Sequence, residues 1–102
     1  MTVAKERELE VLVAMQQALL GEVSNKLRAV YVSWTDSSVH FDCYFDGEID
    51  EIDVESMWIV DTEILAAFPE AHQITHAVHR WDYPKPIPVG RMCVFSRREP
   101  KS

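Results

Sequence analysis

Hydrophobic residues near the start of the chain recur at helical spacing. Residues 3–20 contain neither glycine nor proline, and their apolar positions repeat every three or four residues, which is typical of an amphipathic helix. The repeating residues are Leu9, Leu12, Val13, Leu19 and Leu20. We therefore predict a helix over residues 3–20 that buries this face, and Gly21 is the kind of residue that ends a helix.

Two later segments have the composition and alternation that are typical of β-strands. Residues 27–34 are rich in Val, Tyr and Trp. Residues 39–46 alternate between an apolar and a polar side. The apolar side is Val39, Phe41, Cys43 and Phe45, and the polar side is His40, Asp42, Tyr44 and Asp46. Residues 35–38 form a turn sequence that joins the two strands into a predicted hairpin.

The second half of the chain predicts one helix and two strands. Asp50 precedes residues 51–68 as a helix N-cap, and a proline ends this helix. Its predicted buried face is Met57, Val60, Ile64 and Phe68. Residues 72–83 and 91–97 are predicted strands, and the three prolines in residues 83–90 require a loop between them.

The predicted element order is α-β-β-α-β-β. Two hairpins connected by a helix favour a four-stranded, mainly antiparallel sheet, with both helices on one face and the other face exposed or bound to a partner. A length of 102 residues suits one compact domain. The predicted fold class is therefore α+β, with a single domain over residues 1–97 and a polar C-terminal tail over residues 98–102.

Acidic residues are concentrated in the middle of the chain. The chain carries 17 acidic and 10 basic residues, which gives a formal net charge of −7. No Lys or Arg occurs between Ala29 and His79, whereas eleven Asp and Glu do, six of them between Asp46 and Glu55. Positions at a helix start account for only some of these acids. The remainder favours a basic partner and argues against direct binding to nucleic acid.

Metal and cofactor chemistry has little support in the sequence. His72, His76 and His79 lack the spacing of a zinc site, and on a strand the last two point to opposite faces. Residues 46–51 resemble the start of a calcium loop, but a glutamate stands where that loop requires glycine. Catalytic motifs and phosphate-binding glycine loops are missing. We therefore expect no catalytic residue, no metal and no cofactor.

The cysteines and the apolar runs bear on the compartment. Cys43 and Cys93 are too few for a disulfide scaffold, so we expect reduced thiols. The N-terminal sequence lacks the apolar region of a secretory signal, and the longest apolar run, residues 11–15, is far shorter than a membrane span. These features favour a cytoplasmic protein that does not enter a membrane.

Three stretches of the chain resemble a known family. They are residues 21–30 (GEVSNKLRAV), 44–56 (YFDGEIDEIDVES) and 80–99 (RWDYPKPIPVGRMCVFSRRE). Together they resemble small acidic bacterial immunity proteins of contact-dependent growth inhibition and related polymorphic toxin systems. The resemblance covers most of the chain. It implies a cytosolic protein that binds and neutralises a toxin domain, often a nuclease, and it implies no catalytic residue.

Charge and resemblance together support one hypothesis, an immunity protein that binds a basic toxin domain through its acidic segment. The candidate contact residues are Asp42, Tyr44, Asp46, Glu48, Asp50, Glu51, Asp53 and Glu55. Tyr44 is expected to be exposed and to serve as an aromatic anchor. Two alternatives remain open, a small carboxylate-dependent enzyme and a housekeeping protein-interaction or oligomerisation domain. The oligomeric state is left open.

Overall fold

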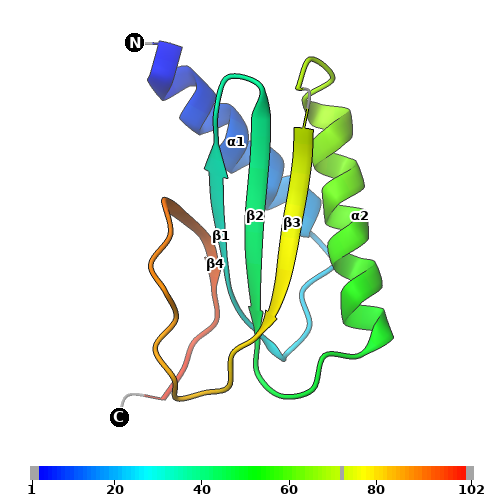
Figure 1. Ribbon diagram of the computed structural model, residues 1–102, viewed down its shortest axis with the longest axis vertical. Coiled ribbons are helices and arrows are strands. Elements are labelled where there is room, and N and C mark those ends of the chain that lie inside the picture. The colour runs from blue at the N-terminus through cyan, green and yellow to red at the C-terminus, as the bar shows by residue number, and fades with distance from the viewer. Residues whose placement is uncertain (1–2, 72, 101–102) are drawn as a thin grey trace.

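The computed structural model describes residues 3–71 and 73–100. Over these residues it contains two helices and four strands in the predicted order (Figure 1). Their bounds are α1 Val3–Leu19, β1 Leu27–Trp34, β2 Ser38–Phe45, α2 Glu51–Ala67, β3 Gln73–Arg80 and β4 Met92–Ser96. The element order read from the hydrophobic pattern is therefore confirmed.

The four strands form one mixed sheet in the order β3-β2-β1-β4. β1 pairs antiparallel with β2 and with β4, whereas β2 and β3 run parallel. The prediction of a mainly antiparallel sheet built from two hairpins is therefore wrong, because β3 and β4 lie at opposite edges (Figure 1). α2 returns the chain along the sheet, so β3 enters beside β2 in the same direction, and residues 81–91 then cross to the far edge.

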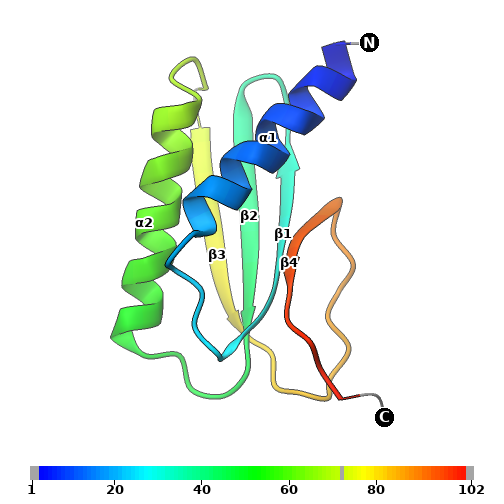
Figure 2. The same ribbon diagram turned by 180° about the vertical axis from the view of Figure 1, so that it is seen from behind.

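Both helices cover the same face of the sheet, as predicted (Figure 2). α1 crosses this face obliquely, and α2 packs against α1 and β3. The large, fully buried side chains between the two layers are Val11, Met15, Leu27, Val30, Val32, Val39, Phe41, Phe45, Met57, Val60 and Ile64. The predicted buried faces of β2 and α2 are therefore confirmed. Among the described residues, neither helix is long and apolar enough to cross a membrane.

α1 buries a face that overlaps the predicted one only in part. The residues that it buries are Val11, Met15, Ala18 and Leu19. Of the predicted face, Leu19 is buried and Leu12 packs against the core, whereas Leu9, Val13 and Leu20 are exposed. The helix is apolar on two sides, so the residue spacing alone fits either face, and the position of the sheet and α2 decides which side is buried.

The connection between β3 and β4 is fastened to the sheet by Arg28. Its Nη1 atom donates hydrogen bonds to the carbonyl oxygens of Trp81 and Lys85, at 2.7 and 2.8 Å. Gly90 lies close to β1, because a Cβ atom at this position would stand 2.8 Å from Cβ of Tyr31. These contacts hold residues 81–91 against β1 and so allow β4 to pair with it.

Candidate functional site

The eight predicted contact residues do not form one surface. Asp42 and Tyr44 lie on the sheet face opposite the helices, where they pair in register with Tyr31 and Ala29 of β1. The other six belong to the connection between β2 and α2 and to the first turns of α2. The structure therefore divides the predicted site into two parts that must be judged separately.

Tyr44 is not the exposed anchor that the sequence predicts. Its alternation with apolar neighbours correctly places it on the outer face of the sheet, but only 8% of its surface is exposed. It stacks on His79 at 4.9 Å between ring centroids, and the rings of Tyr31 and Trp81 meet it edge-on at 6.4 and 5.9 Å. Burial raises the pKa of its hydroxyl. Tyr44 is therefore part of an aromatic cluster that packs the outer face.

Asp42 is engaged by two histidines on the same face. Its Oδ1 atom lies 2.9 Å from Nε2 of His79 and 3.2 Å from Nε2 of His40. The second ring nitrogen of His40 lies 2.7 Å from the hydroxyl of Thr75. These contacts form a polar chain across β2 and β3, so Asp42 holds the outer face together more than it offers a free charge.

Asp46 is neutralised by the C-terminal part of the chain. Its Oδ2 atom lies 2.7 Å from Nη2 of Arg97, and its Oδ1 atom accepts a hydrogen bond from the backbone N–H of Tyr83 at 3.1 Å. The hydrogen bond from Arg97 holds the pKa of the Asp46 carboxyl below its ordinary value. This acid therefore links the end of β2 to residues that follow β3 and β4.

Asp50 and Asp53 serve the start of α2. Asp50 is the N-cap, as predicted, and its Oδ1 atom accepts a hydrogen bond from the backbone N–H of Asp53 at 3.0 Å. That hydrogen bond lowers the pKa of the Asp50 carboxyl. Nζ of Lys26 lies 3.1 Å from Oδ2 of Asp50 and 4.0 Å from Oδ2 of Asp53, which is buried. Asp50 is therefore occupied by the helix cap and by Lys26, whereas Oδ2 of Asp53 is buried without a hydrogen-bond partner among the described residues.

Three of the eight predicted residues remain free, and we call them the free acids. They are Glu48, Glu51 and Glu55. All three are exposed, and their carboxylates form no ion pair with any residue in the ranges 3–71 and 73–100. The sequence could not separate these three from the other four predicted acids, because the bases that pair with Asp46 and Asp50 are remote in the chain. Lys26 and Arg97 lie 24 and 51 positions from Asp50 and Asp46.

The outward side of α2 is also unusually apolar. Its exposed hydrophobic residues are Ile52, Val54, Trp58, Ile59 and Leu65. None of them belongs to the predicted contact set. They lie in the predicted helix but outside its predicted buried face, which is the signal that could have found them. Exposed apolar groups that cluster on one element mark an interaction surface far better than scattered ones do.

Trp58 is held in place although 59% of it is exposed. Its ring meets His76 of β3 edge-on, at 4.6 Å between centroids. His76 in turn stacks on the buried ring of Phe41 at 5.1 Å and donates from Nδ1 to Oδ2 of Asp61 at 2.6 Å. Because this support is buried and hydrogen-bonded, Trp58 projects from α2 with little freedom to lose on binding.

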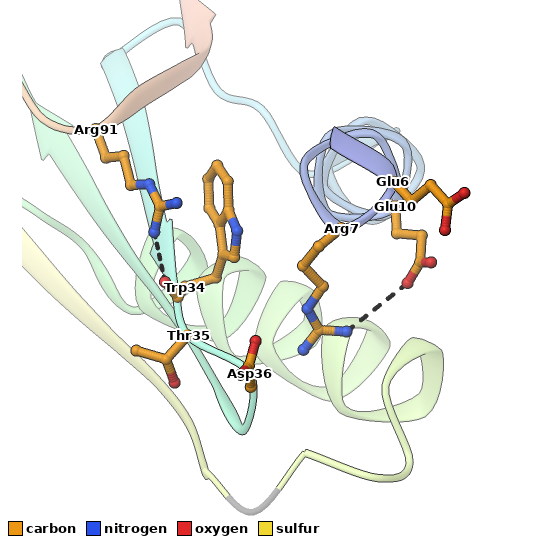
Figure 3. A pocket seen from close by; sticks show the side chains of 7 residues that line it. All are labelled: Glu6, Arg7, Glu10, Trp34, Thr35, Asp36 and Arg91. Atoms are coloured by element: carbon orange, nitrogen blue, oxygen red, sulfur yellow. Dashed lines mark hydrogen bonds and ion pairs between the residues drawn. The ribbon is translucent and has the colours of Figure 1, made fainter. Parts of the chain in front are cut away.

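A polar pocket of about 380 Å³ lies between α1 and the β1–β2 turn (Figure 3). On one side, the guanidinium of Arg91 lies 3.8 Å above the ring of Trp34. On the other, Arg7 lies 3.7 Å from Glu10, and its Nε and Nη2 atoms have no hydrogen-bond partner among the described residues. Glu6, Glu10 and Asp36 outnumber the two arginines that line the pocket, so it does not favour an anion.

The two cysteines and the histidines His76 and His79 lie on different faces of the sheet and form no common site. His76 faces the helices and His79 faces the outer side, as predicted, and His72 lies outside the described residues. Cys43 is buried on the helix side, where burial raises the pKa of its thiol, whereas Cys93 is exposed on the outer side. In the part of the chain that the structure describes, no three His, Cys, Asp or Glu side chains are placed to hold a metal ion.

Apolar side chains interleaved with unpaired carboxylates have the composition of a protein-binding surface. The outward side of α2 has this composition, whereas Asp46 and Asp50 of the predicted contact set are paired with Arg97 and Lys26 within the fold. The fold is a small α+β domain, and the surface has the composition of the class of domains that bind another protein.

The comparison with known families agrees with that class. The family model described as MafI2 immunity protein matches residues 8–99. The chain belongs to this family and is an immunity protein of a bacterial polymorphic toxin system, as the sequence resemblance indicated. Such a protein binds a cognate toxin. None of the curated proteins matches the chain.

Proposed function

We propose that this immunity protein neutralises a toxin domain with a basic surface, and that it binds this surface through the free acids Glu48, Glu51 and Glu55. The observation that carries the proposal is the absence of Lys and Arg between Ala29 and His79. Remote bases pair with Asp46 and Asp50, and Asp53 is buried, but the free acids stay exposed and unpaired within the described chain. The proposed contact set is therefore narrower than the eight residues predicted from sequence.

Electrostatic attraction suits an inhibitor that must reach its target before the target acts. An uncompensated charge on one partner steers an oppositely charged partner and raises the association rate by about 10- to 1000-fold at low salt. A nuclease is the toxin class that this charge favours, because a nuclease must itself attract phosphate with basic groups. The cytoplasm, where such a toxin would find its substrate, is the proposed compartment.

The first experiment establishes the pair. The chain is co-expressed with the protein encoded just upstream of it, as the candidate toxin, and growth rescue and co-purification are scored. Rescue with co-purification of a stable complex is the expected result. A wild-type chain that neither rescues growth nor binds this toxin would overturn the proposed toxin pairing.

The second experiment tests the acidic surface. A Glu51→Lys/Glu55→Lys variant is compared with a Glu8→Lys/Asp36→Lys control, which changes net charge equally. Glu8 belongs to the first half of α1, and Asp36 belongs to the β1–β2 turn. The N-terminal end of α1 and this turn lie at the opposite end of the molecule from the start of α2 (Figure 1). Each variant is first checked for cooperative thermal unfolding, because a lysine near a helix N-terminus is mildly unfavourable.

The expected result is a change in association rate that depends on where the charges lie. Reversal on α2 should slow association about tenfold at low salt and flatten its salt dependence, whereas the control should slow it less than about threefold. Equal effects of the two folded variants would show that the contact does not involve the start of α2. That outcome would overturn the acidic surface while leaving the immunity role intact.

A further inference from the structure

We infer that Trp58 is the anchor of the toxin contact, and that its ring together with the carboxylate of Glu55 receives a basic side chain of the toxin. The inference rests on the proposed function and names the chemistry of its contact. It assigns the outward side of α2 a role in toxin binding that follows neither from the charge distribution of the sequence nor from the family match.

The spacing of α2 brings the required groups together. Glu51 and Glu55 precede Trp58 by seven and three positions, and Leu65 follows it by seven, so all four lie on one side of the helix. Val54, four positions before Trp58, extends the apolar stripe. Trp58 therefore stands between an apolar stripe and a row of free acids, which is the arrangement of an anchor with a polar rim.

The charge around Trp58 selects the occupant. A tryptophan ring is the best aromatic partner for a cation, and an arginine that stacks on it can also bind a neighbouring carboxylate through two parallel hydrogen bonds. An apolar toxin segment would desolvate Glu55 without pairing it, which is costly. A basic side chain satisfies the ring and the carboxylate at once.

A second copy of the chain fits this surface poorly. In a two-fold contact the same patch faces itself, so Glu51 and Glu55 of one copy would oppose the same acids of the other. The segment between Ala29 and His79 contains no base that could relieve this repulsion. The occupant with matching chemistry is therefore a basic patch on the toxin.

The preorganisation of Trp58 supports a role in affinity. Its edge-on contact with His76 is backed by the stacking of His76 on Phe41 and by the hydrogen bond to Asp61. A side chain that is already ordered loses little entropy when a partner covers it. Tryptophan and arginine are also the residue types most often found at energetic hot spots of interfaces.

The test measures binding of the neighbouring-gene toxin domain to the wild-type chain and to Trp58→Ala, Trp58→Leu and Glu55→Gln variants. Trp58→Leu keeps an apolar contact with His76 but removes the aromatic face, so it decides the question if the alanine variant does not fold. Val89→Ala is the control, because Val89 is an exposed apolar residue of the loop between β3 and β4.

We expect Trp58→Ala to raise the dissociation constant at least about 30-fold and Trp58→Leu to raise it about 10-fold, mainly through faster dissociation. Val89→Ala should bind like the wild type. In the combined Trp58→Leu/Glu55→Gln variant, the dissociation constant should rise by less than the product of the factors for the two single variants. The reason is that both groups contact the same basic side chain.

Each contrary result overturns a different statement. A folded Trp58→Leu variant that binds within about twofold of the wild type would show that Trp58 is not the anchor. If the factors by which the dissociation constant rises simply multiply in the combined variant, Trp58 and Glu55 do not share one basic side chain. A concentration-dependent dimer that Trp58→Ala abolishes would assign the surface to a second copy. Loss of association on reversal of Glu51 and Glu55, with no effect at Trp58, would leave the proposed function standing and overturn this inference alone.

Discussion

The guanidinium of Arg28 and the carboxylate of Glu99 form a bidentate pair that joins β1 to the end of the described chain. Nε lies 2.7 Å from Oε2, and Nη2 lies 3.0 Å from Oε1. Arg28 is 3% exposed, although it belongs to a strand of the sheet. Arg97 adds a contact of 3.1 Å to the same Oε2 atom. Glu99, which falls in the segment predicted to be a polar tail, is therefore bound to the sheet.

Replacement of Arg28 should destabilise the fold strongly. Arg28→Met removes both contacts to Glu99 and leaves the carbonyl oxygens of Trp81 and Lys85 without their donor. We expect a loss of about 3 kcal/mol in the free energy of unfolding, measured by urea denaturation. The control is Arg98→Met, because Arg98 is exposed and adjoins Glu99 in the sequence. It should change the free energy of unfolding by less than about 0.5 kcal/mol. Equal effects of the two substitutions would show that the buried pair is unimportant.

Stability should fall in acid because two carboxyl groups titrate differently in the folded and unfolded chain. Hydrogen bonds from Arg97 to Asp46 and from Arg28 to Glu99 hold the pKa of each carboxyl below its ordinary value. The unfolded chain therefore binds more protons in acid. This stabilisation is complete above the ordinary carboxyl pKa of roughly 4 and is lost as the pH falls through the lower folded pKa values.

Urea denaturation at a series of pH values between about 6 and 2.5 measures this effect. Glu99→Gln should flatten the acid slope of the unfolding free energy, because the residue no longer titrates. Parallel wild-type and Glu99→Gln profiles would contradict the assignment. The comparison uses slopes, so a uniform loss of stability in the variant does not affect it.

The buried face of α1 can be tested by two truncations on the same helix. Met15→Ala should reduce the free energy of unfolding by about 2–5 kcal/mol, because Met15 is fully buried in the core. Leu9→Ala should reduce it by less than about 1 kcal/mol, because Leu9 is half-exposed. Thermal and urea unfolding check both values. A larger loss of unfolding free energy for Leu9→Ala than for Met15→Ala would instead support the buried face predicted from sequence.

The two thiols should differ sharply in reactivity. Cys93 is exposed, whereas Cys43 is buried against the sulfur of Met57, and burial raises the pKa of the Cys43 thiol. A thiol reagent should therefore label one cysteine of the native protein at once and the second only after unfolding. Mass spectrometry of the labelled peptides identifies the site, and Cys93→Ser should abolish the rapid phase. Rapid native labelling of Cys43 would contradict the packing.

Local periodicity was enough to predict most elements but not their neighbours in space. The turn of residues 35–38, the cap Asp50 and the stripe of Met57, Val60 and Ile64 are set by adjacent residues and were predicted correctly. The partner of β4 was not, because the connection over residues 81–91 is long enough to reach either edge of the sheet. Its actual course depends on Arg28, which is far away in the sequence.

The prediction of the candidate site was wrong where segments remote in the sequence surround a residue. Alternation correctly predicted the direction of Tyr44, but Tyr31, His79 and Trp81 cover it from two neighbouring strands and the segment after β3. A count of charges correctly predicted an acidic segment. It could not tell Asp46, which Arg97 neutralises, from an acid such as Glu55 that stays free.

The position of β1 at the centre of the sheet implies an order of folding. Val30 pairs with Cys43, thirteen positions later, and with Phe95, sixty-five positions later. The entropy of closing the longer loop costs about 1.4 kcal/mol more, so the β1–β2 hairpin should form early and β4 should dock last. Measured φ-values should accordingly be high for Val32→Ala and near zero for Val94→Ala. Until β4 docks, β1 is an open edge, and the nascent chain is most exposed to wrong strand pairing at that stage.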